Sequence, residues 1–134
     1  MASDFLTTYA PLANDIATRT GLDPSVVLGV IDTETGGGQH VLGNNIFGIT
    51  PPGGVARYPD VQTAAQAFIN LMQTPRYRGV ATLAPAAQPA GLVQSGYNTA
   101  NPSYAAIVGA KAAAAAKQLG YQDGQPSADR KSVV

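Results

Sequence analysis

Hydrophobic residues recur at the three- and four-residue spacing of amphipathic helices over most of the chain. The first such pattern occupies residues 9–17 and stops at Gly21, which is typical of a helix C-terminus. A second helix is expected to start where Asp23 can cap it and Pro24 can take the first helical position. The glycines at 36–38 are expected to end this helix, so the N-terminal part of the chain is predicted to be helical.

The helical pattern resumes after an irregular stretch at 39–59, in which paired asparagines, prolines and glycines signal turns. This stretch is the natural place for a binding groove, and it leaves room for at most a stub of hairpin at 50–58. Asp60 and the pair Asn101 and Pro102 are expected to start the first and last of the later helices. These later helices are expected at 61–72, 76–83, 87–95 and 102–119.

The length of the chain limits it to one core. It has 134 residues, of which 45% are hydrophobic, and this is too short for two ordinary domains. We therefore expect one all-α domain at 1–121. The remaining stretch at 122–134, QDGQPSADRKSVV, has almost nothing to bury and is expected to be a disordered tail or a linker.

Charge and composition exclude several functional classes. Eight basic and eight acidic residues give a net charge of zero, so no basic stripe indicates nucleic acid. The absence of cysteine excludes disulfides and thiolate chemistry, and one histidine among scattered aspartates offers no metal cluster, so no metal or cofactor is expected. The first residues lack the basic flank and long apolar stretch of a secretion signal or a membrane helix.

Glu34, the only glutamate of the chain, occupies an unusual position. The residues three, four and seven positions before it are Ile31, Val30 and Val27, so its side chain is expected to project from an apolar helix face. Desolvation and the negative end of the helix dipole both raise the pKa of such a carboxyl. A carboxylic acid that keeps its proton near neutral pH is suited to general-acid catalysis at a glycosidic oxygen. The alternatives are that Glu34 turns into solvent or forms an ion pair with Arg57, Arg76 or Arg78.

Four segments resemble, in order, those of one enzyme family. They are ETGGG at 34–38, NNIFGI at 44–49, ARYPDVQTAAQAFINLMQTPRYRGV at 56–80 and SGYNTANPSYAAIV at 95–108. The chain is similar in these segments, across about residues 9–117, to the glucosaminidases typified by flagellar muramidases and bacterial autolysins. The resemblance implies a small lysozyme-like helical fold with a substrate groove that cleaves peptidoglycan glycan strands next to N-acetylglucosamine.

The resemblance also implies roles for single residues. Glu34 would be the general acid, and Tyr97 would place a phenol in the groove near it. Asn45 would orient its loop or a sugar, or it is a turn residue bonded to its own backbone. Phe47 would pack beneath the groove, or it is a plain core residue.

Two further residues are expected either at the substrate or in ordinary structural roles. Tyr104 either stacks on a sugar face or packs between helices. His40, just after the glycines, either touches the substrate or is an ordinary loop side chain.

The chain departs from the family between Ile49 and Arg57, where it carries only TPPGGVA. The family usually has a longer hairpin lobe there, which bears a second glutamate. Asp60 is the nearest downstream acid and could serve as the second carboxylate, although it reads first as a helix cap. With one carboxylate, either the acetamido group of the substrate attacks, as in some glycosidases, or a muramic acid hydroxyl closes an anhydro product, as in lytic transglycosylases. Hydrolysis is favoured because the four segments match the hydrolytic family.

The missing lobe leaves a rival interpretation open. The chain could be a non-catalytic wall-binding or assembly module of a phage tail or a secretion apparatus. In either case it would act in the periplasm or cell wall, on peptidoglycan rather than on a membrane. Without an export signal, a bacteriolytic protein of this kind would be delivered by bacteriophage lysis, on a virion or through a secretion machine.

Overall fold

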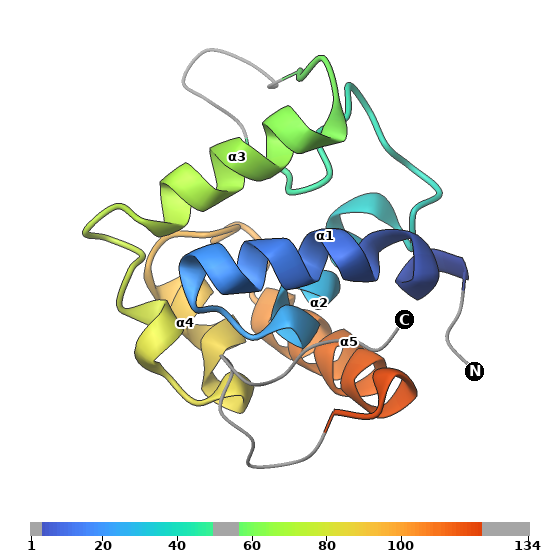
Figure 1. Ribbon diagram of the computed structural model, residues 1–134. Coiled ribbons are helices and arrows are strands. Elements are labelled where there is room, and N and C mark those ends of the chain that lie inside the picture. The colour runs from blue at the N-terminus through green and yellow to red at the C-terminus, as the bar shows by residue number, and fades with distance from the viewer. Residues whose placement is uncertain (1–3, 50–56, 122–134) are drawn as a thin grey trace.

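The computed structural model describes residues 4–49 and 57–121, and these ranges contain helices and turns but no strand (Figure 1). The prediction of an all-helical domain is confirmed. The predicted tail at 122–134 and most of the predicted hairpin stub at 50–58 lie outside the described ranges. The helices are α1 (Asp4–Thr20), α2 (Pro24–Thr35), α3 (Val61–Met72), α4 (Gln88–Gln94) and α5 (Tyr104–Leu119), and the 3-10 turns η1 (Val80–Thr82) and η2 (Pro85–Ala87) precede α4.

Helix α2 is the centre of the fold. Every residue from 22 to 31 is buried, so α2 is covered on all sides rather than on one face. Helix α5 packs against it most extensively and α1 crosses it in front in the view of Figure 1. The run VVLGVI at 26–31 explains this burial, because it is apolar all round. The end of α2 is therefore held by the core.

Gly29 allows α2 and α5 to come into backbone contact. A Cβ atom at this position would lie 2.7 Å from the carbonyl oxygen of Val108 and 3.2 Å from the backbone nitrogen of Ala112. Any larger residue would have to push α5 away, because the obstructing atoms are backbone atoms. The spacing of these two helices is thus fixed by a glycine.

The predicted N-caps of α2 and α3 are confirmed. Asp23 accepts a hydrogen bond on Oδ2 from the backbone N–H of Ser25 at 3.1 Å. Asp60 accepts one on Oδ1 from the backbone N–H of Thr63 at 2.7 Å. Both caps satisfy N–H groups that the first helical turn leaves without an intrahelical partner.

Two predicted boundaries are wrong. The last helix begins at Tyr104 rather than directly after Asn101, whose side chain instead accepts a hydrogen bond from the backbone N–H of Ser103 at 3.0 Å and closes a turn. The helix predicted at 76–83 is reduced to the 3-10 turn η1. In both places short-range turn bonds compete with helix initiation.

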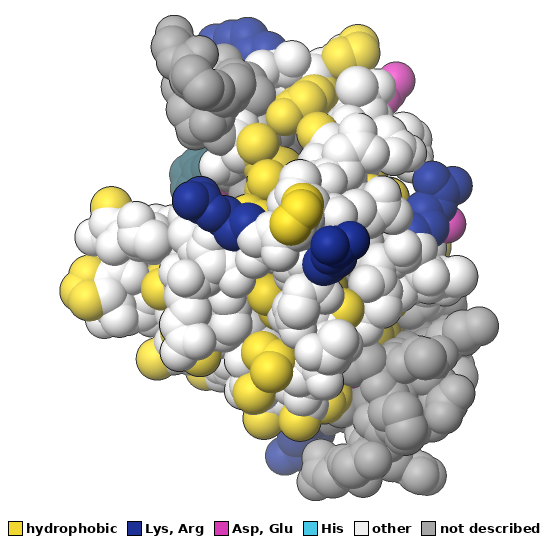
Figure 2. All heavy atoms as spheres, turned by 90° about the vertical axis from the view of Figure 1, so that its left-hand side faces the viewer, with side chains coloured by type: hydrophobic (Ala, Val, Ile, Leu, Met, Phe, Trp, Pro, Cys, Tyr) yellow, Lys and Arg dark blue, Asp and Glu magenta, His cyan; other side chains and the backbone are white. Residues whose placement is uncertain are grey.

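The described surface lacks a broad apolar patch. Its exposed large hydrophobic residues are Val41, Leu42 and Leu83. Figure 2 shows the face that carries the connection from α3 to α4, where hydrophobic side chains are scattered and basic side chains lie near the centre. None of the described helices is both long enough and apolar enough to cross a membrane.

Candidate active site

Glu34 lies in the last turn of α2, where this buried helix reaches the surface. Its side chain is half-buried, whereas the neighbouring Thr35 is fully buried. Helix α2 ends because Gly36 takes a left-handed φ of 58°, and its N–H donates to the carbonyl oxygen of Asp32. The core therefore fixes the backbone that carries the Glu34 carboxyl.

Glu34 lines a groove with a volume of about 540 Å³. The walls of the groove come from four places: the end of α2, the loop before residue 50, the last turn of α3 with the turn that follows it, and the loop between α4 and α5. Glu34 is the only carboxylate among the described residues that line it. The lining residues are Glu34, Gly48, Ile49, Leu71, Tyr77, Gly96, Tyr97, Asn98, Thr99 and Ala100.

The Glu34 carboxyl is held from three segments of the chain. The hydroxyl of Tyr104, at the start of α5, donates a hydrogen bond to its Oε2 at 2.9 Å. The side chain of Asn98 also forms a hydrogen bond with the carboxyl, from a backbone with a positive φ of 50°. On the remaining side, Oε1 lies so close to Gly48 that a Cβ atom there would be only 2.3 Å away.

Burial raises the pKa of Glu34 above the ordinary value of a glutamate. The hydrogen bonds from Tyr104 and Asn98 act in the opposite direction, since donors favour the ionised carboxyl, but burial outweighs them. Neither of the two ion pairs among the described residues involves Glu34. The direction expected from the apolar helix face is therefore found, and no described arginine forms an ion pair with this carboxyl.

Tyr97 lines the groove but its hydroxyl points into the protein. This hydroxyl donates to the backbone carbonyl of Phe47, and the ring meets Phe68 edge-on with centroids 6.2 Å apart. Burial raises the pKa of Tyr97 well above that of a free phenol, so the hydroxyl keeps its proton. Phe47 stacks on Phe68 with centroids 4.4 Å apart and is a fully buried core residue.

The other predicted site residues do not line the groove. Asn45 exchanges two side-chain hydrogen bonds with the backbone of Ile49, at 3.0 and 3.2 Å, and so closes the loop that contains Gly48. His40 is exposed and lies against Gly36. Asp60 is exposed at the start of α3, and its hydrogen bonds from the side chain and backbone of one threonine lower its pKa.

Sequence reasoning missed Gly48 and Asn98. Gly48 belongs to the segment NNIFGI, but only the position of Glu34 in space explains why a side chain cannot be placed there. Asn98 was visible as an asparagine after Tyr97, and asparagine tolerates the left-handed backbone that it adopts. Both residues are more than ten positions from Glu34 in the sequence, so helix periodicity could not predict that they contact it.

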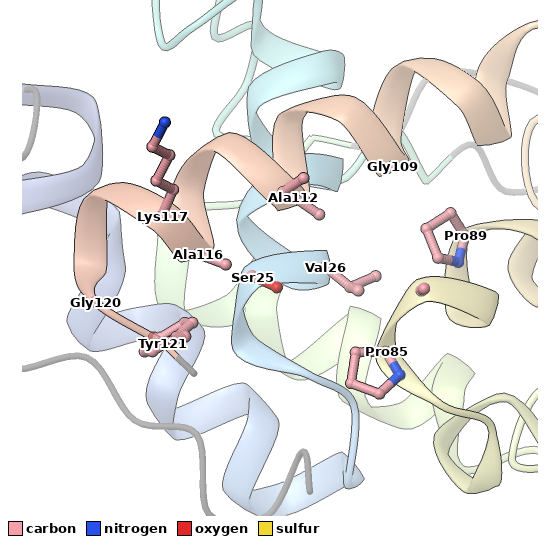
Figure 3. A pocket seen from close by; sticks show the side chains of 12 residues that line it. Ser25, Val26, Pro85, Pro89, Gly109, Ala112, Ala116, Lys117, Gly120 and Tyr121 are labelled. Carbon is pink, nitrogen blue, oxygen red and sulfur yellow. The ribbon is translucent and has the colours of Figure 1, made fainter. Parts of the chain in front are cut away.

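A second hollow lies between α5 and the segment that leads into α4 (Figure 3). Its volume is about 670 Å³, and its walls are mostly prolines, alanines and glycines, with Lys117 the one charged lining residue and Tyr121 at its end. None of its described lining residues carries a carboxylate, whereas the smaller groove contains Glu34. Across the described ranges, no group of three or more histidine, aspartate or glutamate residues could hold a metal ion.

Solved structures share this fold. The peptidoglycan hydrolase of Sphingomonas sp. A1 matches with a TM-score of 0.74 at 21% identity, over 92% of this chain and 97% of that one. A mutant of that hydrolase matches with a TM-score of 0.77 at 21% identity, over 90% of this chain and 100% of that one. The glycoside hydrolase domain of FlgJ from Salmonella typhimurium matches with a TM-score of 0.70 at 23% identity, over 86% of this chain and 88% of that one. The predicted fold of this family is therefore confirmed.

Sequence comparison identifies the family. A search of curated proteins gives no significant match. The model of the family Glucosaminidase, described as mannosyl-glycoprotein endo-beta-N-acetylglucosaminidase, matches residues 10–119. Because this match runs from within α1 to the end of α5 and includes the whole groove, the chain belongs to the glucosaminidase family.

Proposed function

We propose that the chain is a glycosidase that cleaves the glycan strands of peptidoglycan, with Glu34 as its general acid. The observation that carries this proposal is a half-buried carboxyl of raised pKa that lines a groove. The family description as an endo-β-N-acetylglucosaminidase supports the bond that is cleaved. The peptidoglycan hydrolases among proteins of the same fold support the polymer.

The contacts of the carboxyl suggest how the proton is transferred. Tyr104 donates to Oε2, and we therefore assign the acidic proton to Oε1. When that proton passes to the glycosidic oxygen, the carboxyl becomes a carboxylate. The donors Tyr104 and Asn98 then stabilise the new charge, because hydrogen bonds to an ionised acceptor are stronger than those to a neutral one.

The presence of a single carboxylate limits which group can attack the anomeric carbon after Glu34 has protonated the glycosidic oxygen. No second carboxylate lines the groove among the described residues, and the stretch TPPGGVA at 50–56 contains none. We favour hydrolysis in which the acetamido oxygen of the substrate attacks the anomeric carbon and water then opens the intermediate. The alternative is attack by a muramic acid hydroxyl, which yields an anhydro sugar as in lytic transglycosylases. Asp60 is a weaker choice of base, because its carboxylate already caps α3.

The test is the clearing of purified peptidoglycan by the wild type and by Glu34→Gln. We expect the wild type to reduce turbidity and the variant, folded to the same melting temperature within a few degrees, to leave it unchanged. Mass spectrometry of the products then separates reducing-end sugars from anhydro sugars, and N-acetylglucosamine at the new reducing end is expected. If neither protein clears the wall, the enzymatic proposal is wrong and a wall-binding module takes its place.

We also propose that the chain acts in the periplasm or cell wall as part of a phage or secretion assembly. Its net charge of zero supports this, since long-range attraction to an anionic wall is absent. Purified protein is expected to clear isolated walls but not intact cells. Lysis of intact cells by the free protein at the same rate would overturn this delivery proposal while leaving the catalytic one in place.

A further inference from the structure

A cation lies at the rim of the groove. Arg76 is exposed in the turn after α3, and its guanidinium lies over Gly96, which lines the groove. A Cβ atom at Gly96 would meet Nη1 of Arg76 at 3.4 Å and the hydroxyl oxygen of Tyr77 at 3.5 Å. Gly96 has a φ of 115°, a backbone conformation that favours glycine. Since glycine has no side chain, the space between the guanidinium and the groove is left open.

No carboxylate of the described protein forms an ion pair with Arg76. The two ion pairs in the described ranges join Asp15 to Arg19 and Asp32 to Lys111. The face that carries the turn after α3 shows basic side chains near its centre, with acidic ones mainly toward its edge (Figure 2). Arg76 is therefore available to an anion that arrives with a ligand in the groove.

Two kinds of glycan that contain N-acetylglucosamine differ in charge. Chitin strands consist of N-acetylglucosamine alone and are neutral. Peptidoglycan strands alternate this sugar with muramic acid, whose lactyl group carries either a free carboxylate or a stem peptide with carboxylates of its own. A guanidinium forms paired, charge-assisted hydrogen bonds with such a carboxylate, which an amide or a neutral hydroxyl cannot replace.

We propose that Arg76 binds a carboxylate on a muramic acid substituent and thereby makes the groove selective for peptidoglycan over neutral glycans. This inference rests on the proposed function, because it assigns a partner to the same groove. Arg76 is a specificity-determining residue in this view and takes no part in proton transfer, which belongs to Glu34. The guanidinium acts from the rim, so its effect is on substrate binding.

The test measures binding in a Glu34→Gln background, where cleavage cannot interfere. The ligands are peptide-bearing glycan oligomers, the same oligomers stripped of peptides by an amidase, and chitohexaose. We expect Arg76→Gln to weaken carboxylate-bearing ligands about tenfold, with no change for chitohexaose, and Arg76→Lys to recover part of the loss. Lys117→Gln, a charge removed at the second hollow, is the matched control and is expected to change nothing.

The ligands also separate the two sources of carboxylate. A loss confined to stripped oligomers assigns the contact to the lactyl carboxylate, because in peptide-bearing oligomers that carboxyl is an amide. A loss confined to peptide-bearing oligomers assigns it to the stem peptide, and equal losses show that Arg76 binds either carboxylate. The inference is overturned if Arg76→Gln weakens chitohexaose as much, if it weakens none of the ligands, or if the parent protein binds none of them. Binding that depends on Arg76, together with absence of cleavage by the wild type, would instead refute the catalytic proposal alone.

Discussion

Gly48→Ala tests whether the position of the Glu34 carboxyl matters for activity. The new methyl group would lie 2.3 Å from Oε1, and restoring an ordinary contact of 3.4 Å requires the carboxyl to move by about 1 Å. A displacement of about 1 Å of a catalytic group can reduce turnover by about 10²-fold. The substitution also places alanine at a φ of 65°, which costs about 1–2 kcal/mol and lowers Tm by roughly 3–8 °C.

Gly120→Ala separates the two effects. Gly120 has a φ of 78° and open space around its absent Cβ, so alanine there bears the same backbone strain without a steric contact. Turnover of soluble glycan oligomers and Tm would be measured for both variants at one pH, well below both melting temperatures. We expect a lower Tm in both variants, with the larger loss in Gly48→Ala because of its additional contact, and a loss of turnover in Gly48→Ala only. If Gly48→Ala is as active as Gly120→Ala, the contact between Gly48 and the carboxyl has no bearing on catalysis.

Three further predictions concern the hydrogen bonds and charge of the site. Tyr104→Phe removes a hydrogen-bond donor that lowers the pKa of Glu34, so the basic limb of the pH–rate profile should move to higher pH. An unshifted basic limb would contradict the assignment of Glu34 as the general acid. The raised pKa of Glu34 contributes stability that is complete below the ordinary carboxyl pKa and is lost as pH rises through the raised one. The Tm of Glu34→Gln should therefore rise relative to that of the wild type as pH increases above about 4. A difference in Tm that is constant with pH would show that burial does not perturb this group. Tyr97→Phe leaves the buried carbonyl of Phe47 without its hydrogen-bond donor, so we expect a loss of about 1 kcal/mol in the free energy of unfolding. An unchanged free energy of unfolding in chemical denaturation would show that this hydrogen bond contributes nothing to stability.

Local signals predicted both ends of α2, which carries Glu34, and the start of α3. The caps at Asp23 and Asp60 and the glycine stop at Gly36 are short-range features, and each is found. The spacing of Glu34 from Ile31 and Val30 was enough to predict a desolvated carboxyl with a raised pKa. These features depend on fewer than ten neighbouring residues, which is the range over which periodicity and capping carry information.

The environment of the carboxyl could not be predicted in the same way. Tyr104 is 70 positions from Glu34, and its hydrogen bond depends on how α2 and α5 cross. The resemblance implied that Tyr97 places a phenol in the groove near Glu34, and Tyr97 does line that groove. Its hydroxyl, however, donates to a backbone carbonyl, and the hydroxyl that donates to Glu34 is that of Tyr104. The sequence does not show which of these two tyrosines donates to Glu34, because this depends on tertiary packing.

The backbone contact at Gly29 links the position of the Glu34 carboxyl to a residue that does not line the groove. Gly29 lies five positions before Glu34 on α2, and its neighbour Val108 lies four positions after Tyr104 on α5. A methyl group at Gly29 would push apart the helices that carry the Tyr104 hydroxyl and the Glu34 carboxyl, although it lies more than a helical turn from their hydrogen bond. This glycine therefore keeps the helices that carry Glu34 and Tyr104 at the separation that their hydrogen bond requires.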